Sequence, residues 1–234
     1  MTIRLQPADN AAPAPAELQA RKPTHIRLDP SMTGAHVASV IAAGNIADLR
    51  HNLQVFMITG NALSVHKSRV SARRLRVFLK GIRASMLPDR YKPLAMNLKL
   101  TMTILHPVRQ HDVVMEWLDT AGAAAPDGAS QRAVMVDDAR AQVSNAGLIG
   151  FVDEFAKLMQ AGAWRRRNTE VFDQPCLCIV PGIIDHSVHR LYRHGSLERV
   201  FQTTGDYHAF RKDLKHLRYW FEFTRSLFAR KDIA

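Results

Sequence analysis

The stretch from Val65 to Arg83 holds seven lysines or arginines and no acidic residue, and it constrains the fold more than any other part of the chain. At about 100° per residue of α-helix, one face collects the side chains of His66, Arg69, Arg73 and Arg76. The opposite face is apolar and carries Leu75, Phe78, Leu79 and Ile82. Such a helix must bury one face against a core. Its other face gathers like charges that destabilise a bare helix, so a bound anion would relieve the repulsion.

A second copy of this pattern occurs 142 positions later, near the end of the sequence. The pattern His-x-x-Arg-x-x-x-basic-x-Leu-Arg begins at His66 and again at His208. A single charged run is adequately explained by a solvated helix face. A solvated face does not require the same residue types at the same offsets, however, so the duplication favours two anion-binding helices.

The candidate anion-binding residues belong to both copies and to a third basic helical stretch that precedes the second copy. They are His66, Arg69, Arg73, Arg74, Arg76, Lys80, Arg190, Arg193, His208, Arg211, Lys212, Lys215 and Arg218. The stripe from His66 to Arg76 spans ten residues, or about 15 Å of helix axis. That is longer than one phosphate or one small nucleotide needs, so two facing stripes would line a groove for a polymer. Arginine offers a planar fork that matches phosphate oxygens, and lysine acts as a point charge.

The chain of 234 residues carries a formal net charge of +11 and has a pI near 10.2, which indicates an anionic partner. Charge alone does not choose among nucleic acid, an acidic membrane surface and a phosphate polymer. Cys176 and Cys178 are too close in the sequence for a disulfide that would stabilise the fold, and two thiols are too few for a zinc site. They favour a reducing compartment. No apolar run approaches the roughly 18 residues that span a bilayer, and the N-terminus lacks a signal-peptide pattern. We therefore expect a cytoplasmic protein with no metal, no cofactor and no membrane insertion.

Apolar residues recur at three- and four-residue steps through most of the chain, and little of it has the pattern of a strand. This periodicity predicts an all-α protein built from antiparallel helical bundles. Helices are expected over 33–59, 62–86, 94–104, 108–118, 131–163, 183–194 and 207–231, with a stop at Gly60-Asn61 and an interruption of 131–163 near Gly147 or Gly150. Residues 1–32 are rich in Ala and Pro and are predicted to be a disordered tail. The loop at 121–130 is predicted to join two halves, 33–125 and 131–234.

The two basic passages resemble the CHAD family, the conserved histidine α-helical domain. They are His66-x-x-Arg69-Val70-x-x-Arg73-Arg74-Leu75-Arg76 and His208-x-x-Arg211-Lys212-x-x-Lys215-His216-Leu217-Arg218-Tyr219-x-x-Glu222. The resemblance covers roughly residues 35–234 and is weak between 125 and 180. It implies two pseudo-symmetric helical bundles around a basic channel that binds inorganic polyphosphate. It also implies an association with polyphosphate granules and no known reaction.

Three features depart from the family pattern. Gln110 replaces an acidic residue, and Asp112 is expected to pair with Arg109 one helical turn away. His216 stands where a basic residue is usual, and it is expected to weaken binding or make it more sensitive to pH. The sequence ends soon after the second copy, so the second bundle is expected to be shortened or completed by another molecule, which leaves a homo-oligomer open.

Binding to a nucleic-acid backbone is the strongest alternative, because counterion release acts in the same way for DNA, RNA and polyphosphate. Proteins that bind single strands stack bases on exposed rings, and here only Tyr219 and Phe223 are expected beside a stripe. An enzyme that processes a phosphate polymer is the weaker alternative, because carboxylates near the stripes are few and no Gly-rich phosphate loop occurs. Glu222 is interpreted as a partner that orients an arginine. The predicted function is therefore polyphosphate binding without catalysis, and no catalytic residue is proposed.

Overall fold

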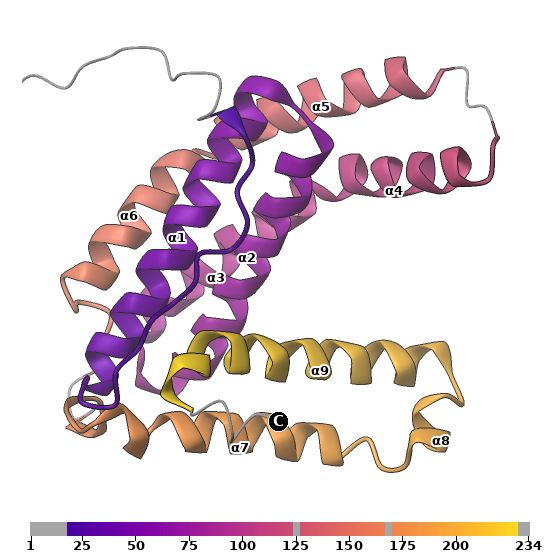
Figure 1. Ribbon diagram of the computed structural model, residues 1–234. Helices are drawn as coiled ribbons and strands as arrows, with labels where there is room; N and C mark the ends of the chain where they lie inside the picture. Colours follow the sequence, from indigo (N-terminus) through magenta and orange to yellow (C-terminus); the bar gives the residue numbers. More distant parts are fainter. Residues whose placement is uncertain (1–17, 124–126, 167–169, 229–234) are drawn as a thin grey trace, which may run out of the picture.

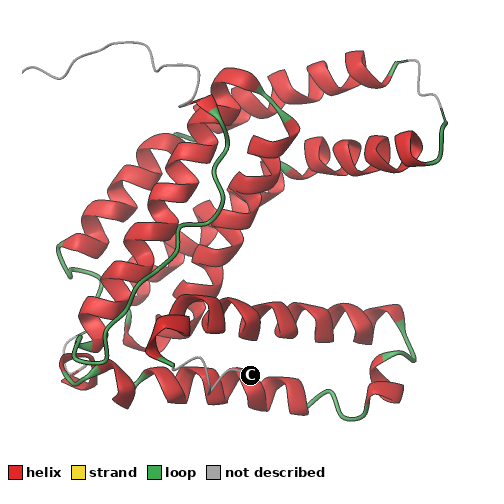
Figure 2. Ribbon diagram, viewed as in Figure 1, coloured by secondary structure: helices red, strands yellow, loops and turns green. Residues whose placement is uncertain are grey.

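The computed structural model describes residues 18–123, 127–166 and 170–228, and this part of the chain is all-α (Figures 1 and 2). Within those ranges there are no β-strands, only the isolated bridges Thr33–Pro175 and Met86–Arg165. The predicted all-α class is confirmed for these residues. The helices are α1 Gly34–Thr59, α2 Ala62–Ile82, α3 Pro88–Ile104, α4 His106–Thr120, α5 Gly128–Asn145, α6 Leu148–Gln160, α7 Val180–Tyr192, the single turn α8 Leu197–Val200, and α9 Thr204–Thr224.

The junction between α1 and α2 follows from two adjacent residues. Gly60 ends α1 in the left-handed conformation, with φ 62°, and its backbone N–H bonds the carbonyl of Phe56. Asn61 then caps α2, because its side-chain oxygen accepts a hydrogen bond of 2.7 Å from the N–H of Ser64. The stop predicted at Gly60-Asn61 is confirmed. With so short a turn, α1 and α2 run antiparallel and side by side (Figure 1).

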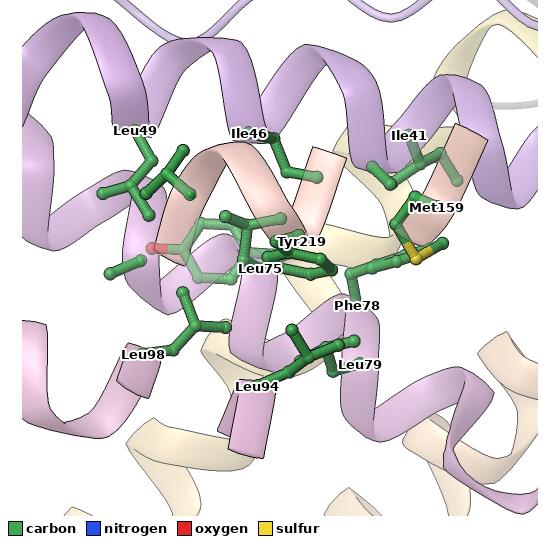
Figure 3. Close-up of a cluster of buried hydrophobic side chains, with 14 of the residues drawn as sticks. Ile41, Ile46, Leu49, Leu75, Phe78, Leu79, Leu94, Leu98, Met159 and Tyr219 are labelled. Atoms are coloured by element: carbon green, nitrogen blue, oxygen red, sulfur yellow. The ribbon is translucent and has the colours of Figure 1, made fainter. Parts of the chain in front are cut away.

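The core lies between α1, α2, α3 and α6 (Figure 3). The apolar face predicted for α2 is buried there, because Leu75, Phe78, Leu79 and Ile82 are all at most 3% exposed. Side chains from the other three helices close around them, among them Ile41, Leu49, Leu94, Leu98 and Met159. Burying one face of α2 in this way fixes its cationic face outward.

The boundary between halves differs from the prediction. Residues 121–123 and 127–130 lie at the tip of a hairpin formed by α4 and α5, which projects away from the core (Figure 1), and residues 124–126 fall outside the described ranges. The chain then returns to the first bundle, where Val152, Phe155 and Met159 of α6 are buried against α1. Residues 128–160 therefore pack with the N-terminal half, because α6 supplies apolar surface that α1 needs.

The described C-terminal part is a helical hairpin. α7 and α9 run antiparallel and are joined through α8, forming a second projection below the first bundle (Figure 1). Trp220 and Phe223 of α9 are buried, whereas Leu214 and Phe221 are 46% and 47% exposed. The apolar face of α9 is thus covered only in part by the described residues, unlike the matching face of α2.

Residues 18–32 pack along α1, which differs from the predicted disordered tail. Ile26 and Leu28 are buried, and the N–H and hydroxyl of Thr24 donate to the carboxylate of Asp48 at 2.8 and 2.6 Å. The physical reason is that buried polar groups on α1, such as Asp48, require partners. Leu28 also bonds the Ser226 hydroxyl just beyond α9, through both its N–H and its carbonyl. The rest of the predicted tail, residues 1–17, falls outside the described residues.

The contact of α2 with α9 depends on a glycine. A Cβ atom at Gly81 would overlap the indole ring of Trp220, which itself packs against Phe78 and Phe223. We expect Gly81→Ala to lower the free energy of unfolding by roughly 1–3 kcal/mol through overpacking, although alanine is the better helix former. Urea denaturation followed by circular dichroism measures this change.

The matched control is Gly150→Ala on α6, where no atom lies within 4 Å of an added Cβ. This variant is expected to gain up to about 1 kcal/mol from helix propensity. An equal gain at both positions would mean that Gly81 is not needed for the α2–α9 contact.

Candidate anion-binding site

α2 and α9 meet at a cavity of about 440 Å³, which we call the groove. Eight of the thirteen predicted residues line it: Arg73, Arg76, Lys80, Arg190, His208, Arg211, Lys212 and Lys215. Its one acidic residue, among the described residues that line it, is Asp213. The structure therefore brings part of each repeated stripe, and one arginine of α7, onto a single cavity.

Helical spacing explains why these side chains share the groove. Arg73, Arg76 and Lys80 are three and four residues apart on α2, so they lie along one face, opposite the buried apolar face. On α9 the same periodicity aligns His208, Arg211, Lys212 and Lys215. Apolar side chains, including those of Val77, Ala95 and Met102, complete the lining of the groove.

Like charges crowd at the crossing of the two helices. Partial burial, followed by repulsion from Arg73, Arg211 and Arg218, lowers the pKa of Lys215 below its usual value. Partial burial and the neighbouring Arg190 likewise lower the pKa of Lys80. Arg73 and Lys215 occupy equivalent positions in the two sequence copies. A polyanion in the groove would remove this mutual repulsion.

Two carboxylates neutralise part of the positive charge. Asp213 forms an ion pair with Arg190 and lies 3.2 Å from Nε2 of His194. Glu222 forms ion pairs with Arg74 and, at 3.2 Å, with Arg218. The interpretation of Glu222 as a residue that orients arginines agrees with these contacts.

Arg74 lies apart from the other predicted residues. It is only 4% exposed, and its Nε donates a 2.8 Å hydrogen bond to Asn45 of α1. Its guanidinium also pairs with Glu222 and stacks over the rings of Phe223 and Tyr219, at 4.8 and 5.5 Å from their centroids. Arg74 is one residue from Arg73, about 100° further round the helix, so it points into the α1–α2–α9 contact and we do not include it in the site.

Four other predicted residues do not line the groove. His66 and Arg69 extend the α2 stripe toward α4, where Arg69 donates to the carbonyl of Met102 and lies 3.4 Å from Nδ1 of His106. Arg218 is exposed beside Lys215, as its repulsion of that residue indicates. Arg193 is exposed near the end of α7.

α4 adds basic groups that the sequence prediction left out. α4 packs against α2, and partial burial, followed by repulsion from Arg109 and Lys67, lowers the pKa of His66. The sequence signal was the position of Arg109 next to Gln110 and one helical turn before Asp112, in a segment compared with the family pattern above. The expected pairing of Asp112 with Arg109 is wrong: Asp112 pairs with Arg132 of α5 at 2.7 Å. Arg109 instead pairs with Glu116 two turns along α4, at 2.9 Å.

The aromatic rings near the groove are already engaged. Tyr219 and Phe223, predicted to lie beside a stripe, are 2% and 0% exposed and sit under Arg74. The other ring in the groove lining, Tyr91, is stacked by Arg83 at 5.1 Å from its centroid. These rings are poorly placed to stack against nucleic-acid bases.

His216 is buried at the inner end of the groove. It is 8% exposed, its Nδ1 lies 3.3 Å from the Ser187 hydroxyl, and its Nε2 contacts no hydrogen-bonding group among the described residues. Burial, followed by repulsion from Arg190 and Lys80, lowers the pKa of His216 to about 4. The ring is therefore neutral near pH 7.

Two further features do not occur among the described residues. No group of three or more His, Cys, Asp or Glu side chains there could hold a metal ion. None of the helices in the described ranges is long and apolar enough to cross a bilayer.

Comparisons with known proteins give one consistent answer. The family model for the CHAD domain matches residues 41–234. Among solved structures, the chain is similar to the CHAD domain from the plant Ricinus communis, with a TM-score of 0.69 and 21% sequence identity. That match covers 92% of this chain and 73% of the other. No curated protein matches the sequence.

Removing the guanidinium of Arg74 tests its role in the fold. We expect Arg74→Met to lower the free energy of unfolding by roughly 1–3 kcal/mol, because Asn45 and Glu222 lose their partner. Arg76→Met, on the exposed side of the same helix, is expected to change it by less than about 0.5 kcal/mol. Urea denaturation of both variants gives the comparison, and similar values would contradict a structural role for Arg74.

The buried His216 predicts a pH-dependent stability. Between about pH 6.5 and 4 the unfolded chain binds a proton at this residue that the folded chain does not, so stability falls as the pH is lowered. The loss attributable to His216 is at most about 3 kcal/mol. Urea denaturation at several pH values should therefore give a steeper fall for the wild type than for His216→Gln. Parallel pH profiles for the two proteins would show that the ring is not held neutral by the fold.

Proposed function

Because this chain belongs to the CHAD domain family, we propose that it binds inorganic polyphosphate in the groove between α2 and α9, without transforming it. The observation that carries the proposal is that residues of both cationic stripes line one cavity. If the duplicated residues served only as solvent-exposed charges on two helix surfaces, they would not need to line the same cavity.

A phosphate polymer fits the distribution of charge. Basic groups continue from the groove along α2, through Arg69 and His66, to Arg109 of α4. This track is longer than a single phosphate, and its arginines can each bind two phosphate oxygens. Every phosphate of a bound chain would relieve repulsion between neighbouring cations, and it would release counterions.

The groove favours polyphosphate over single-stranded nucleic acid. Its lining contains few rings, and arginines already stack on Tyr91 and Tyr219. Base stacking, which supplies much of the affinity of single-strand binders, would have to displace these contacts. A ligand made only of phosphates has no such requirement.

Binding without turnover agrees with the state of the nearby carboxylates. Asp213 and Glu222 are both held in ion pairs with arginines, so neither is placed as a general base.

A protein that binds polyphosphate in this way would gather at polyphosphate granules in the cytoplasm.

The deciding experiment is a competition assay. Labelled long-chain polyphosphate is bound to the full chain, and unlabelled polyphosphate, DNA or RNA is added at equal phosphate content. We expect strong dependence on salt and poor displacement by both nucleic acids. Equal displacement by DNA or RNA would reduce the proposal to general polyanion binding.

Charge reversal tests the location of the site. Arg73→Glu with Arg76→Glu is expected to weaken polyphosphate binding tenfold or more, equivalent to about 1.4 kcal/mol or more. The salt dependence should also become shallower, because fewer phosphates are contacted. Helical circular dichroism should be unchanged.

The control is Lys22→Glu with Arg27→Glu, which makes the same change in net charge at two exposed residues outside the groove. This pair should retain most of the affinity. Equal losses in both double variants would mean that net charge, rather than the groove, determines binding.

A further inference from the structure

A second cavity, of about 660 Å³, adjoins the groove. It lies between the end of α2, the 3-10 turn Arg83–Ser85, the start of α3, and α7. The two cavities share Lys80, Tyr91, Arg190 and His216. Its volume is within the range of pockets that hold small organic ligands.

The lining of this inner cavity has two kinds of surface. Basic and imidazole side chains are contributed by Lys80, Arg83, Lys92, His186, Arg190 and His216, and no carboxylate occurs among the described residues that line it. Apolar groups are contributed by Met86, Pro88, Ile179 and Ile183, next to the ring of Tyr91. The groove, in contrast, presents a denser row of cations along α2 and α9.

A bare phosphate chain would use only half of this surface. It would gain from the cations but would dehydrate Pro88, Ile179 and Ile183 without covering them by apolar contact. A ligand with a flat apolar body and attached phosphates would use both parts. Arg83, already stacked on Tyr91 at 5.1 Å, presents a planar face of the kind that packs against aromatic rings.

We propose that the inner cavity binds a nucleotide, with its base against the apolar wall and its phosphates toward the cations shared with the groove. This site is additional to the polyphosphate groove, and it takes a different class of ligand. Neither proposal requires the other to be correct.

His216 supplies a second, independent indication of a ligand. The side chain is more than nine-tenths buried on the border of the two cavities, and its Nε2 contacts no hydrogen-bonding group among the described residues. Buried polar atoms are nearly always satisfied. A phosphate at this border would favour the protonated ring, in which Nε2–H donates to a phosphate oxygen while Nδ1–H donates to the Ser187 hydroxyl, whose own proton goes to the carbonyl of Ile183.

Gly182 allows the inner cavity to be filled without disturbing the fold. It lines the cavity from α7, and no atom lies within 4 Å of a Cβ added there. Gly182→Phe would therefore project a ring into the space assigned to the base. Gly150→Phe on α6 introduces the same residue at another exposed helical glycine with equally open surroundings.

The experiment measures ADP binding to the full chain by isothermal titration calorimetry. Adenosine and inorganic triphosphate are titrated as partial ligands, and long-chain polyphosphate is titrated into the same preparations. We expect ADP to bind the wild type more tightly than adenosine or triphosphate does. Gly182→Phe should weaken ADP binding at least tenfold, and Gly150→Phe should leave it unchanged.

The possible failures are distinguishable. Absence of ADP binding to a wild type that binds polyphosphate would overturn the nucleotide site alone. ADP binding that Gly182→Phe does not weaken would place the nucleotide elsewhere, and triphosphate binding as tightly as ADP would mean that the apolar wall contributes nothing. A wild type that binds ADP but does not bind polyphosphate would instead overturn the proposed function. Unfolding curves of both variants confirm that each is folded.

Discussion

The buried guanidinium of Arg74 sets the relative position of the two cationic helices. It joins α1 through Asn45 and α9 through Glu222, and it packs on the rings of Tyr219 and Phe223. An ion pair in such a place contributes little net stability, because desolvation offsets the attraction, but it disfavours arrangements that leave the charge unpaired. The α7–α9 hairpin is thereby held in one orientation against the first bundle, and the groove depends on that orientation.

The docking of α9 brings like charges together as well as apolar residues. The contact of Gly81 with Trp220 permits close approach of the helices, and the approach places Lys215 within the field of Arg73. Packing and the Arg74 link must outweigh this repulsion in the absence of ligand. The repulsion is therefore stored in the folded protein, where it becomes available as binding energy for a polyanion.

The local features were predictable from the sequence, and the long-range partners were not. The apolar face of α2, the stop at Gly60-Asn61 and the family follow from periodicity, turn chemistry and the repeated motif. Arg74 was counted among the candidate site residues because it belongs to the first copy of the motif, and a motif does not reveal which neighbouring helix covers a given angle. The packing of residues 18–32 on α1 was missed for a related reason: their composition is polar and Pro-rich, and their order depends on buried acceptors that lie about 25 residues away.

The bond between Leu28 and Ser226 has a consequence for the order in which the molecule assembles. These residues are 198 positions apart, so contacts of this kind form late and slow the search for the native state. During synthesis, residues 18–32 leave the ribosome long before the partner beyond α9 exists. A segment made 198 positions before its partner can thus be attached to it only after α9 has been made.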